Sequence, residues 1–196
     1  FWYVARRFLP DPYATLSDFR VTTQKQKYNL IRRLAALLAD VHEKGLVHGN
    51  IKASNIVIRK DECDSGFTHA FLLDPSLNLL LPEDDEVTRW TVLRRCPKYR
   101  SPEELDGQVP TQYSDLYSLG WVFFSILAGR SPFAGMAPPE TLACHLQGPV
   151  PDLPDEQQPW QGLHDHRTAI TPTERPADAG EVLGIIDRLI LKGKKY

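Results

Sequence analysis

The chain has 196 residues, of which 42% are hydrophobic and 24% are charged, the ordinary balance of a globular protein with one core. Its net charge of −2 excludes the strongly basic footprint of a nucleic-acid-binding domain, so no nucleic-acid partner is predicted. Its apolar runs are shorter than the roughly 18–20 residues that a membrane-spanning helix needs, so no membrane span is predicted.

Cysteine usage and the start of the chain bear on its location. Cys63, Cys96 and Cys144 are odd in number and lack metal-type spacing, which predicts free thiols in a reducing compartment. The chain starts with Phe1 and without a signal-type leader, so we expect a fragment or a processed chain. The predicted location is cytoplasmic, or the intracellular domain of a longer protein.

The first part of the chain predicts a strand, a connector and a helix. Phe1–Ala5 is apolar, and a proline-containing connector follows it through residue 12. Tyr28–Lys44 repeats leucines at helical spacing, and Gly45 is a natural helix end. Residues 1–44 contain no glycine, which excludes a glycine-rich phosphate-binding loop from this part of the chain.

A polar loop and two short strands are predicted next. Residues 48–55 read His-Gly-Asn-Ile-Lys-Ala-Ser-Asn. Ile56–Ile58 and Phe71–Leu73 are typical of short strands, with a polar turn at residues 60–66 between them. The second strand ends at Asp74. Taken alone, the loop is equally typical of a polar connection between a helix and a strand.

Two further helices are predicted in the second half of the chain. Ser114 is the expected N-cap of a buried helix whose apolar part, Trp121–Ala128, ends at Gly129. Glu181–Lys192 has the apolar periodicity of an amphipathic helix that closes the chain.

The segment between these helices, from Ala137 to Trp160, is rich in proline. A short helix is predicted inside it at Thr141–Leu146. The segment is either a loop of the fold or a docking segment for a protein partner, because extended proline segments lose little entropy on binding. His164 and His166 flank Asp165 without a third ligand in view, so no metal site is predicted there.

Several of these segments resemble motifs of the protein-kinase family. Residues 48–55 and Asp74 resemble its catalytic loop, H-R-D-x-K-x-x-N, and the acid of its D-F-G motif. Cys96–Glu103 resembles T-P-x-Y-x-A-P-E, Ser114–Gly120 resembles the start of the central helix, and Thr171–Pro176 resembles x-x-P-x-x-R-P. The chain as a whole is similar to the C-terminal lobe of a eukaryotic-like serine/threonine protein kinase.

A second family shares part of this pattern. Aminoglycoside-type phosphotransferases use an H-G-D-x-x-x-x-N loop. Gly49 matches the second position of that loop, whereas the kinase loop has arginine there. They lack counterparts of Cys96–Glu103 and of the helix start at Asp115, so the protein kinases are the better match.

The resemblance implies an α+β fold that is mainly α, a kinase large lobe with a hinge strand. Residues 1–12 correspond to the last small-lobe strand and the hinge, and residues 13–196 to the large lobe. The chain carries no glycine-rich loop and no strand with the kinase lysine, so the small lobe is expected to be missing.

The implied site is degenerate. Asn50 takes the place of the catalytic aspartate, and an amide cannot accept a proton near neutral pH as a carboxylate can. Gly49 replaces the arginine that pairs with an activation-segment phosphate, so this switch is expected to be lost. Lys52 remains as a phosphate contact, and Asn55 and Asp74 remain as nucleotide and metal ligands. The resemblance therefore implies either ATP with Mg²⁺ or no cofactor at all.

Other matched residues are structural by resemblance. His48 belongs to the loop, and Asp115 would bond to the loop backbone. Glu103 and Arg175 would form a buried ion pair. Proline and serine at positions 75–76 replace the Phe-Gly of the kinase motif, which predicts a locked segment.

These features together predict a pseudokinase, which has no catalytic activity of its own. It would act as a scaffold or as an allosteric binding module for a protein partner. The alternative is a weak or unconventional ATP-dependent serine/threonine phosphotransferase. In that case positioning and metal charge would carry most of the rate, and Asn50 would only orient the acceptor.

Overall fold

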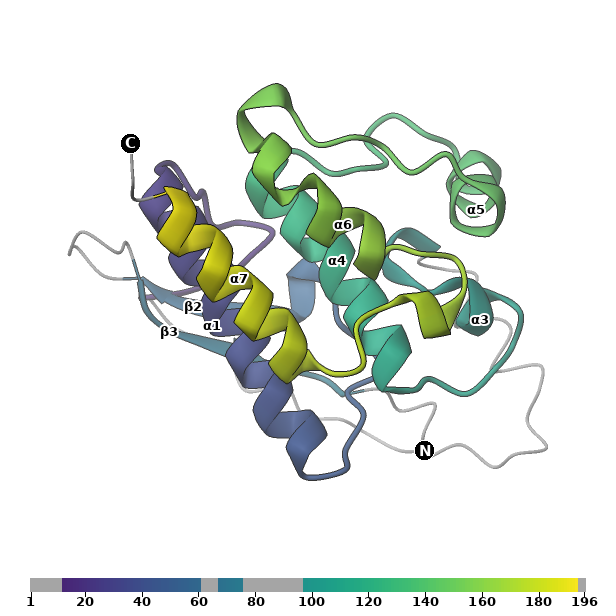
Figure 1. Cartoon of the computed structure of the whole chain (residues 1–196), viewed down its shortest axis with the longest axis horizontal. Helices are drawn as coiled ribbons and strands as arrows, with labels where there is room; N and C mark the ends of the chain where they lie inside the picture. The colour runs from purple at the N-terminus through teal and green to yellow at the C-terminus, as the bar shows by residue number, and fades with distance from the viewer. Residues whose placement is uncertain (1–11, 61–66, 76–96, 194–196) are drawn as a thin grey trace.

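The computed structural model describes residues 12–60, 67–75 and 97–193. It is mainly helical with one small sheet (Figure 1), in agreement with the prediction of an α+β fold that is mainly α. The elements in chain order are β1 (Tyr13–Thr15), α1 (Gln24–Glu43), β2 (Ile56–Lys60), β3 (Phe67–Leu72), α3 (Pro102–Leu105), α4 (Gln112–Ala128), α5 (Pro138–Gln147), α6 (Gln161–Arg167) and α7 (Ala179–Gly193). Short 3-10 turns lie at Ala53–Asn55, Pro97–Tyr99, Asp155–Trp160 and Pro172–Glu174.

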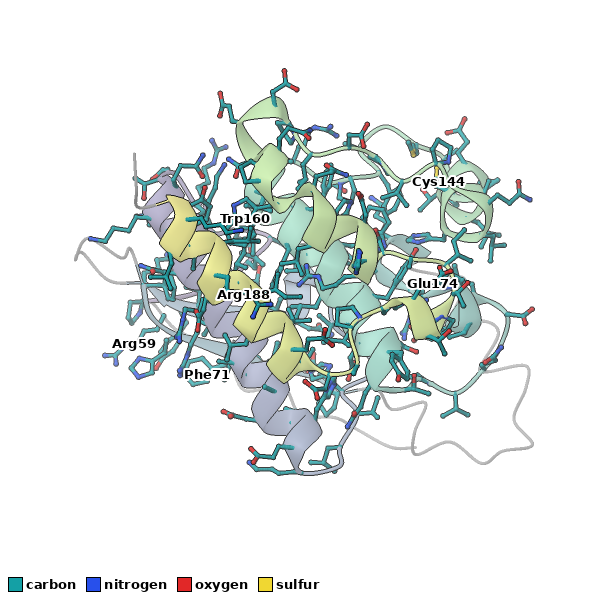
Figure 2. The ribbon with its side chains drawn as sticks, in the orientation of Figure 1. Arg59, Phe71, Cys144, Trp160, Glu174 and Arg188 are labelled. Atoms are coloured by element: carbon teal, nitrogen blue, oxygen red, sulfur yellow. The ribbon has the colours of Figure 1, made fainter. Side chains whose placement is uncertain are left out.

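Some sequence predictions fall outside the described residues. They are the strand at Phe1–Ala5, most of the connector after it, the turn at residues 61–66, Cys63, Ser76 and Cys96. Cys144 lies on α5 (Figure 2) and is a free thiol, as predicted.

The sheet is antiparallel, with the strand order β1-β2-β3. Both predicted strands are confirmed, although β2 extends to Lys60 and β3 begins four residues earlier than expected, at Phe67. β1 was not predicted. It has only three residues, and pairing fixes it, because Leu16 N donates to Ile56 O at 2.8 Å and Lys60 N donates to Pro12 O at 2.8 Å.

Helix α1 begins at Gln24, earlier than the predicted Tyr28, because a capping box forms there. Thr23 Oγ1 accepts from Gln26 N at 3.2 Å, and Gln26 Oε1 accepts from Thr23 N at 3.4 Å, which satisfies backbone donors that a helix start leaves free. The helix ends just before Gly45, whose φ of +70° suits glycine.

Helix α4 is the buried helix that the sequence predicted, and it ends before Gly129 at φ +67°. Its N-cap is Thr111, however, so the assignment of Ser114 to that position was wrong. Ser114 is the third helical residue, and its Oγ accepts from Thr111 N at 3.1 Å. Gly120 allows α6 to approach closely, since a Cβ there would lie 3.1 Å from Thr168 Cγ2.

Helix α7 confirms the predicted closing helix and lies alongside α1, with the sheet behind α1 in this view (Figure 1). The contact is apolar inside, where Val182 and Ile186 of α7 are fully buried. At its exposed edge Arg32 Nε and Asp187 Oδ1 form an ion pair at 2.6 Å. The two helices thus share one core although they lie far apart in the sequence.

An aromatic cluster fills the core beside α4. Trp121 packs against Phe133 with ring centroids 4.7 Å apart and against His164 at 5.4 Å. Burial, and next the charge of Arg167, lowers the pKa of His164 to about 4. His164 is therefore a core side chain, and the described residues contain no group of three or more His, Cys, Asp or Glu that could hold a metal ion.

Arg167 at the end of α6 is buried in the same region. Its guanidinium carbon lies 3.9 Å from the centre of the Phe123 ring, a stacked cation–π arrangement. Burial lowers the pKa of Arg167 to about 9.

The proline-rich segment is partly helical. The short helix predicted at Thr141–Leu146 is the longer α5, with proline in its first turn. Thr141 and His145 on this helix are buried, and the Tyr117 hydroxyl lies 2.7 Å from His145 Nδ1. These contacts attach α5 to the core. Over the described part of the chain, no helix combines the length and the apolar composition that crossing a bilayer requires.

Candidate functional site

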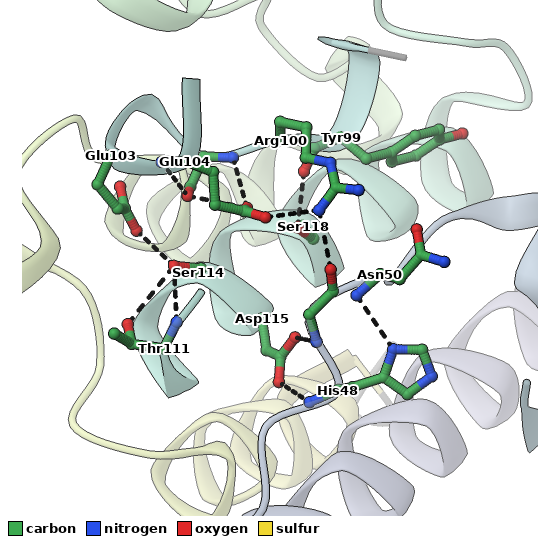
Figure 3. Close-up of polar contacts among 12 residues, drawn as sticks. His48, Asn50, Tyr99, Arg100, Glu103, Glu104, Thr111, Ser114, Asp115 and Ser118 are labelled. Carbon is green, nitrogen blue, oxygen red and sulfur yellow. Dashed lines mark hydrogen bonds and ion pairs between the residues drawn. The ribbon is translucent and has the colours of Figure 1, made fainter. Parts of the chain in front are cut away.

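The loop at residues 48–55 connects α1 to β2 and receives a carboxylate from the first turn of α4 (Figure 3). Asp115 Oδ2 accepts from His48 N and Oδ1 accepts from Gly49 N, both at 2.7 Å. Asp115 is buried, and charge-assisted hydrogen bonds of this length are strong. The acid of α4 therefore fixes the start of the loop.

Two histidines complete this attachment. His42 Nε2 on α1 lies 3.1 Å from Asp115 Oδ2 and donates to it, since a carboxylate only accepts. Burial lowers the pKa of His48, although the negative charge of Asp115 acts to raise it. Its neutral ring accepts at Nδ1 from Asn50 N at 3.3 Å, so it orients the backbone at the next position.

Arg100 holds the loop from the opposite side. Its Nη1 donates to Gly49 O at 2.8 Å and to Glu104 Oε1 at 2.6 Å. Burial raises the pKa of Glu104, and the charge of Arg100 opposes this rise. Both the N–H and the C=O of Gly49 are thus bonded to charged side chains, and its φ of +67° suits glycine.

Asn50, at the position of the catalytic aspartate, has an engaged side chain. Its Nδ2 donates to the backbone oxygen of Asp74 at 2.9 Å. Asp74 itself has φ +54°, which is uncommon for a residue other than glycine. The structure therefore brings the two positions together through the Asn50 amide and the Asp74 carbonyl.

Asn55 is buried, and its Nδ2 donates to Asn50 O at 3.0 Å. This bond turns the amide nitrogen toward the loop and leaves Oδ1 as the oxygen available to a cation. Oxygen ligands of this type, together with the carboxylate of Asp74, suit Mg²⁺. The residue types and this orientation thus fit a magnesium ion.

Lys52 lies in a small hollow beside the loop, next to Asn50, Tyr99 and Arg100. Tyr99 is fixed there because Ser118 Oγ donates to its backbone oxygen at 2.6 Å. Burial raises the pKa of Tyr99. Lys52 and Asn50 are therefore the two predicted catalytic positions that the fold brings to one surface.

Glu103 and Arg175 form a buried bidentate pair. Arg175 Nη1 lies 2.7 Å from Glu103 Oε1, and Nη2 lies 2.8 Å from Oε2. Burial alone would raise the pKa of Glu103, but the hydrogen bonds and charge of Arg175 hold it below its usual value. Ser114 Oγ also donates to Glu103 at 2.9 Å, so the pair ties the start of α4 to α3.

Two features of the site were not predicted from the sequence. The first is Arg100, which precedes the N-cap Ser101 of α3 and forms an ion pair with Glu104 on that helix. The second is a hollow of about 680 Å³ that adjoins the loop at Ala53 and carries Arg20 and Arg130 in its lining.

The comparisons with known proteins agree with this geometry. A family model described as "Protein kinase domain" matches residues 11–167, most of the chain. "Serine/threonine-protein kinase pkn2" of Myxococcus xanthus is 35% identical over 125 residues, which cover 62% of this chain and 15% of that protein. "Serine/threonine-protein kinase PkaB" of Streptomyces coelicolor is 30% identical over 158 residues, which cover 75% of this chain and 37% of that protein.

A third relative gives the same result. "Serine/threonine-protein kinase PrkC" of Bacillus subtilis is 30% identical over 127 residues, which cover 65% of this chain and 18% of that protein. The chain spans well under half the length of these relatives. The match contains the loop, Asp74 and the helix that carries Asp115. The predicted family is therefore confirmed: the chain belongs to the protein kinase domain family, with relatives named as serine/threonine-protein kinases.

Proposed function

We propose that this protein is a pseudokinase, a kinase-fold binding module that acts as a scaffold or allosteric partner of another protein and does not transfer phosphate. The observation that carries the proposal is Asn50, which stands at the catalytic-base position and donates its amide N–H to Asp74 O. The division into residues 1–12 and 13–196 and a cytoplasmic location are parts of the same proposal.

The chemistry of the amide supports an inactive site. A kinase base accepts the proton of the substrate hydroxyl, and an amide has no comparable basicity near neutral pH. The side-chain amide of Asn50 donates to the Asp74 carbonyl oxygen. An aspartate at position 50 would place a carboxylate oxygen against that carbonyl oxygen, and the two would repel each other. The local structure therefore suits asparagine at this position better than aspartate.

The fixed loop supports a binding role. Asp115 bonds to the backbone N–H groups of His48 and Gly49, and Arg100 bonds to the carbonyl of Gly49. A loop held by these two charged side chains presents one conformation to a partner, which lowers the entropy cost of association.

A weak serine/threonine phosphotransferase is the second candidate, because the orientation of Asn55 favours it. Asn55 Oδ1 and the Asp74 carboxylate would hold magnesium, which neutralises phosphate charge when bound. Loss of a general base typically reduces the rate by about 10²–10⁴-fold rather than abolishing it. In this reading Asn50 orients the acceptor hydroxyl.

Nucleotide binding and turnover test the proposal. Thermal unfolding with ATP, with and without magnesium, is measured on the protein and on Asp74→Ala, alongside transfer of labelled phosphate to a protein acceptor. We expect no transfer above background in the unaltered protein. Transfer that Asp74→Ala abolishes would overturn the pseudokinase proposal and favour the second candidate, and Asn50→Asp would then be assayed for a higher rate.

A further inference from the structure

We propose that the hollow beside the loop binds an acidic segment of a protein partner, seated against Arg20 and Arg130. The hollow has a volume of about 680 Å³ and is formed by the turn between β1 and α1, by Ala53 and Tyr99, and by the end of α4 with the turn after it. Pockets that bind ligands commonly span roughly 300–1,000 Å³.

The charged side chains in the described part of this lining are all positive. Arg20 and Arg130 are exposed, and neither forms an ion pair within the part of the chain that the structure describes. The described lining residues include no aspartate or glutamate. Asp18 belongs to the same turn but is not among the lining residues, and its Oδ2 accepts from Thr15 Oγ1 at 2.6 Å. Complementary charge therefore favours a ligand with carboxylates.

The apolar residues that line the hollow indicate that the ligand also carries an apolar side chain. Leu16 and Ile126 are buried side chains in its lining, and Phe19 is half-buried. The carbonyls at the end of α4 would repel a carboxylate, but Lys27 Nζ donates to one of them, Leu127 O, at 2.7 Å. The matching ligand is a peptide segment with an apolar side chain flanked by Asp or Glu.

The place of the hollow links it to the loop. Tyr99 lines both this hollow and the small one that contains Asn50 and Lys52. A segment bound at Arg20 and Arg130 would thus run toward the degenerate catalytic position. The inference rests on the proposed function in taking the ligand to be a protein segment, and it supplies the chemistry of that segment.

Peptide binding tests the charge preference. Fluorescence anisotropy is measured with a labelled peptide that carries leucine between glutamates, and with the same peptide in which glutamine replaces each glutamate. No nucleotide or magnesium is added, so the outcome is independent of phosphate transfer. We expect tighter binding of the glutamate peptide, weakened by salt. Equal binding of both peptides overturns the proposal and leaves the result on phosphate transfer unaffected.

Variants locate the site. Arg20→Gln and Arg130→Gln should each weaken the glutamate peptide about threefold, and the double variant about tenfold, since exposed ion pairs contribute about 0.2–1 kcal/mol. Arg188→Gln removes the same charge from α7 (Figure 2), outside the hollow, and should leave binding unchanged. An equal loss of affinity in Arg188→Gln would show that only the net charge of the protein matters, and it would contradict the assignment of the site to the hollow.

The chain carries its own acidic run, Glu-Asp-Asp-Glu at residues 83–86, which is an alternative occupant. A variant with glutamine and asparagine at these four positions tests whether this run occupies the hollow and competes with the peptide. We expect unchanged affinity for the glutamate peptide. A rise of tenfold or more would assign the hollow to this run and overturn the proposal of a partner segment.

Discussion

Asn50 Nδ2 donates a 2.9 Å hydrogen bond to the backbone oxygen of Asp74, so the catalytic-base position is bonded to the metal-ligand position through an amide N–H. A carboxylate cannot make this bond. The loss of the base and the conformation of the Asp74 backbone are thus coupled in one contact.

Asn50→Asp is expected to destabilise the protein by about 1–3 kcal/mol, because it replaces a donor by an oxygen that faces the Asp74 carbonyl. Urea unfolding measures the difference. Asn29→Asp on the exposed side of α1 makes the same chemical change without such a contact and should shift stability by less than about 0.5 kcal/mol. Equal stability of Asn50→Asp and the unaltered protein would show that the bond contributes nothing.

Arg175→Met should destabilise the protein by about 3–5 kcal/mol, because it leaves Glu103 buried without its cation. A double-mutant cycle with Glu103→Gln isolates the pair. The contrasting pair is Arg32–Asp187, whose side chains are 51% and 41% exposed, and Arg32→Met should cost about 1 kcal/mol or less. Similar costs for both arginines would contradict the assignment of Arg175 to a buried pair.

Asp115→Asn is expected to free the start of the loop. An amide offers one accepting oxygen in place of two, so either His48 N or Gly49 N loses its partner. Hydrogen exchange of these two amides should accelerate, and the free energy of unfolding should fall by about 1–3 kcal/mol. Asp187→Asn serves as the surface control. Retained protection of both amides would rule out Asp115 as the residue that fixes the loop.

Stability should fall between pH 6.5 and pH 4 because of His164. Burial lowers its pKa to about 4, whereas the unfolded chain titrates at about 6.5. Across this window the unfolded chain binds a proton that the folded chain does not, so acidification favours unfolding by up to about 3 kcal/mol.

His164→Gln removes this contribution, and urea unfolding across the same pH range measures it. His166→Gln, two residues away and exposed, is the matched control and should keep the original slope. An unchanged slope in His164→Gln would exclude His164 as its source.

The sequence predicted elements whose signals are local. The apolar spacing of α1, the long apolar run of α4 and the periodicity of α7 each lie within one segment, and all three helices are present. The N-cap of α4 was misplaced because Thr111 and Ser114 both suit that position, and the capping box that decides between them is a matter of geometry.

The features that escaped prediction depend on distant segments. β1 is a strand only because β2 pairs with it. Arg100 bonds to Gly49 across a separation of 51 residues, and no local pattern indicates that contact. The hollow with Arg20 and Arg130 is formed by parts of the chain that are more than a hundred residues apart.

The packing of α1 against α7 has a consequence for synthesis. Helix α1 leaves the ribosome long before α7, with its buried Val182 and Ile186, exists to pack against it. Domains dominated by such distant contacts fold slowly, and the uncovered surface is prone to aggregation in the interval. A nascent chain therefore completes the packing between α1 and α7 only after α7 has been synthesised, so the apolar surface of α1 stays uncovered over that interval.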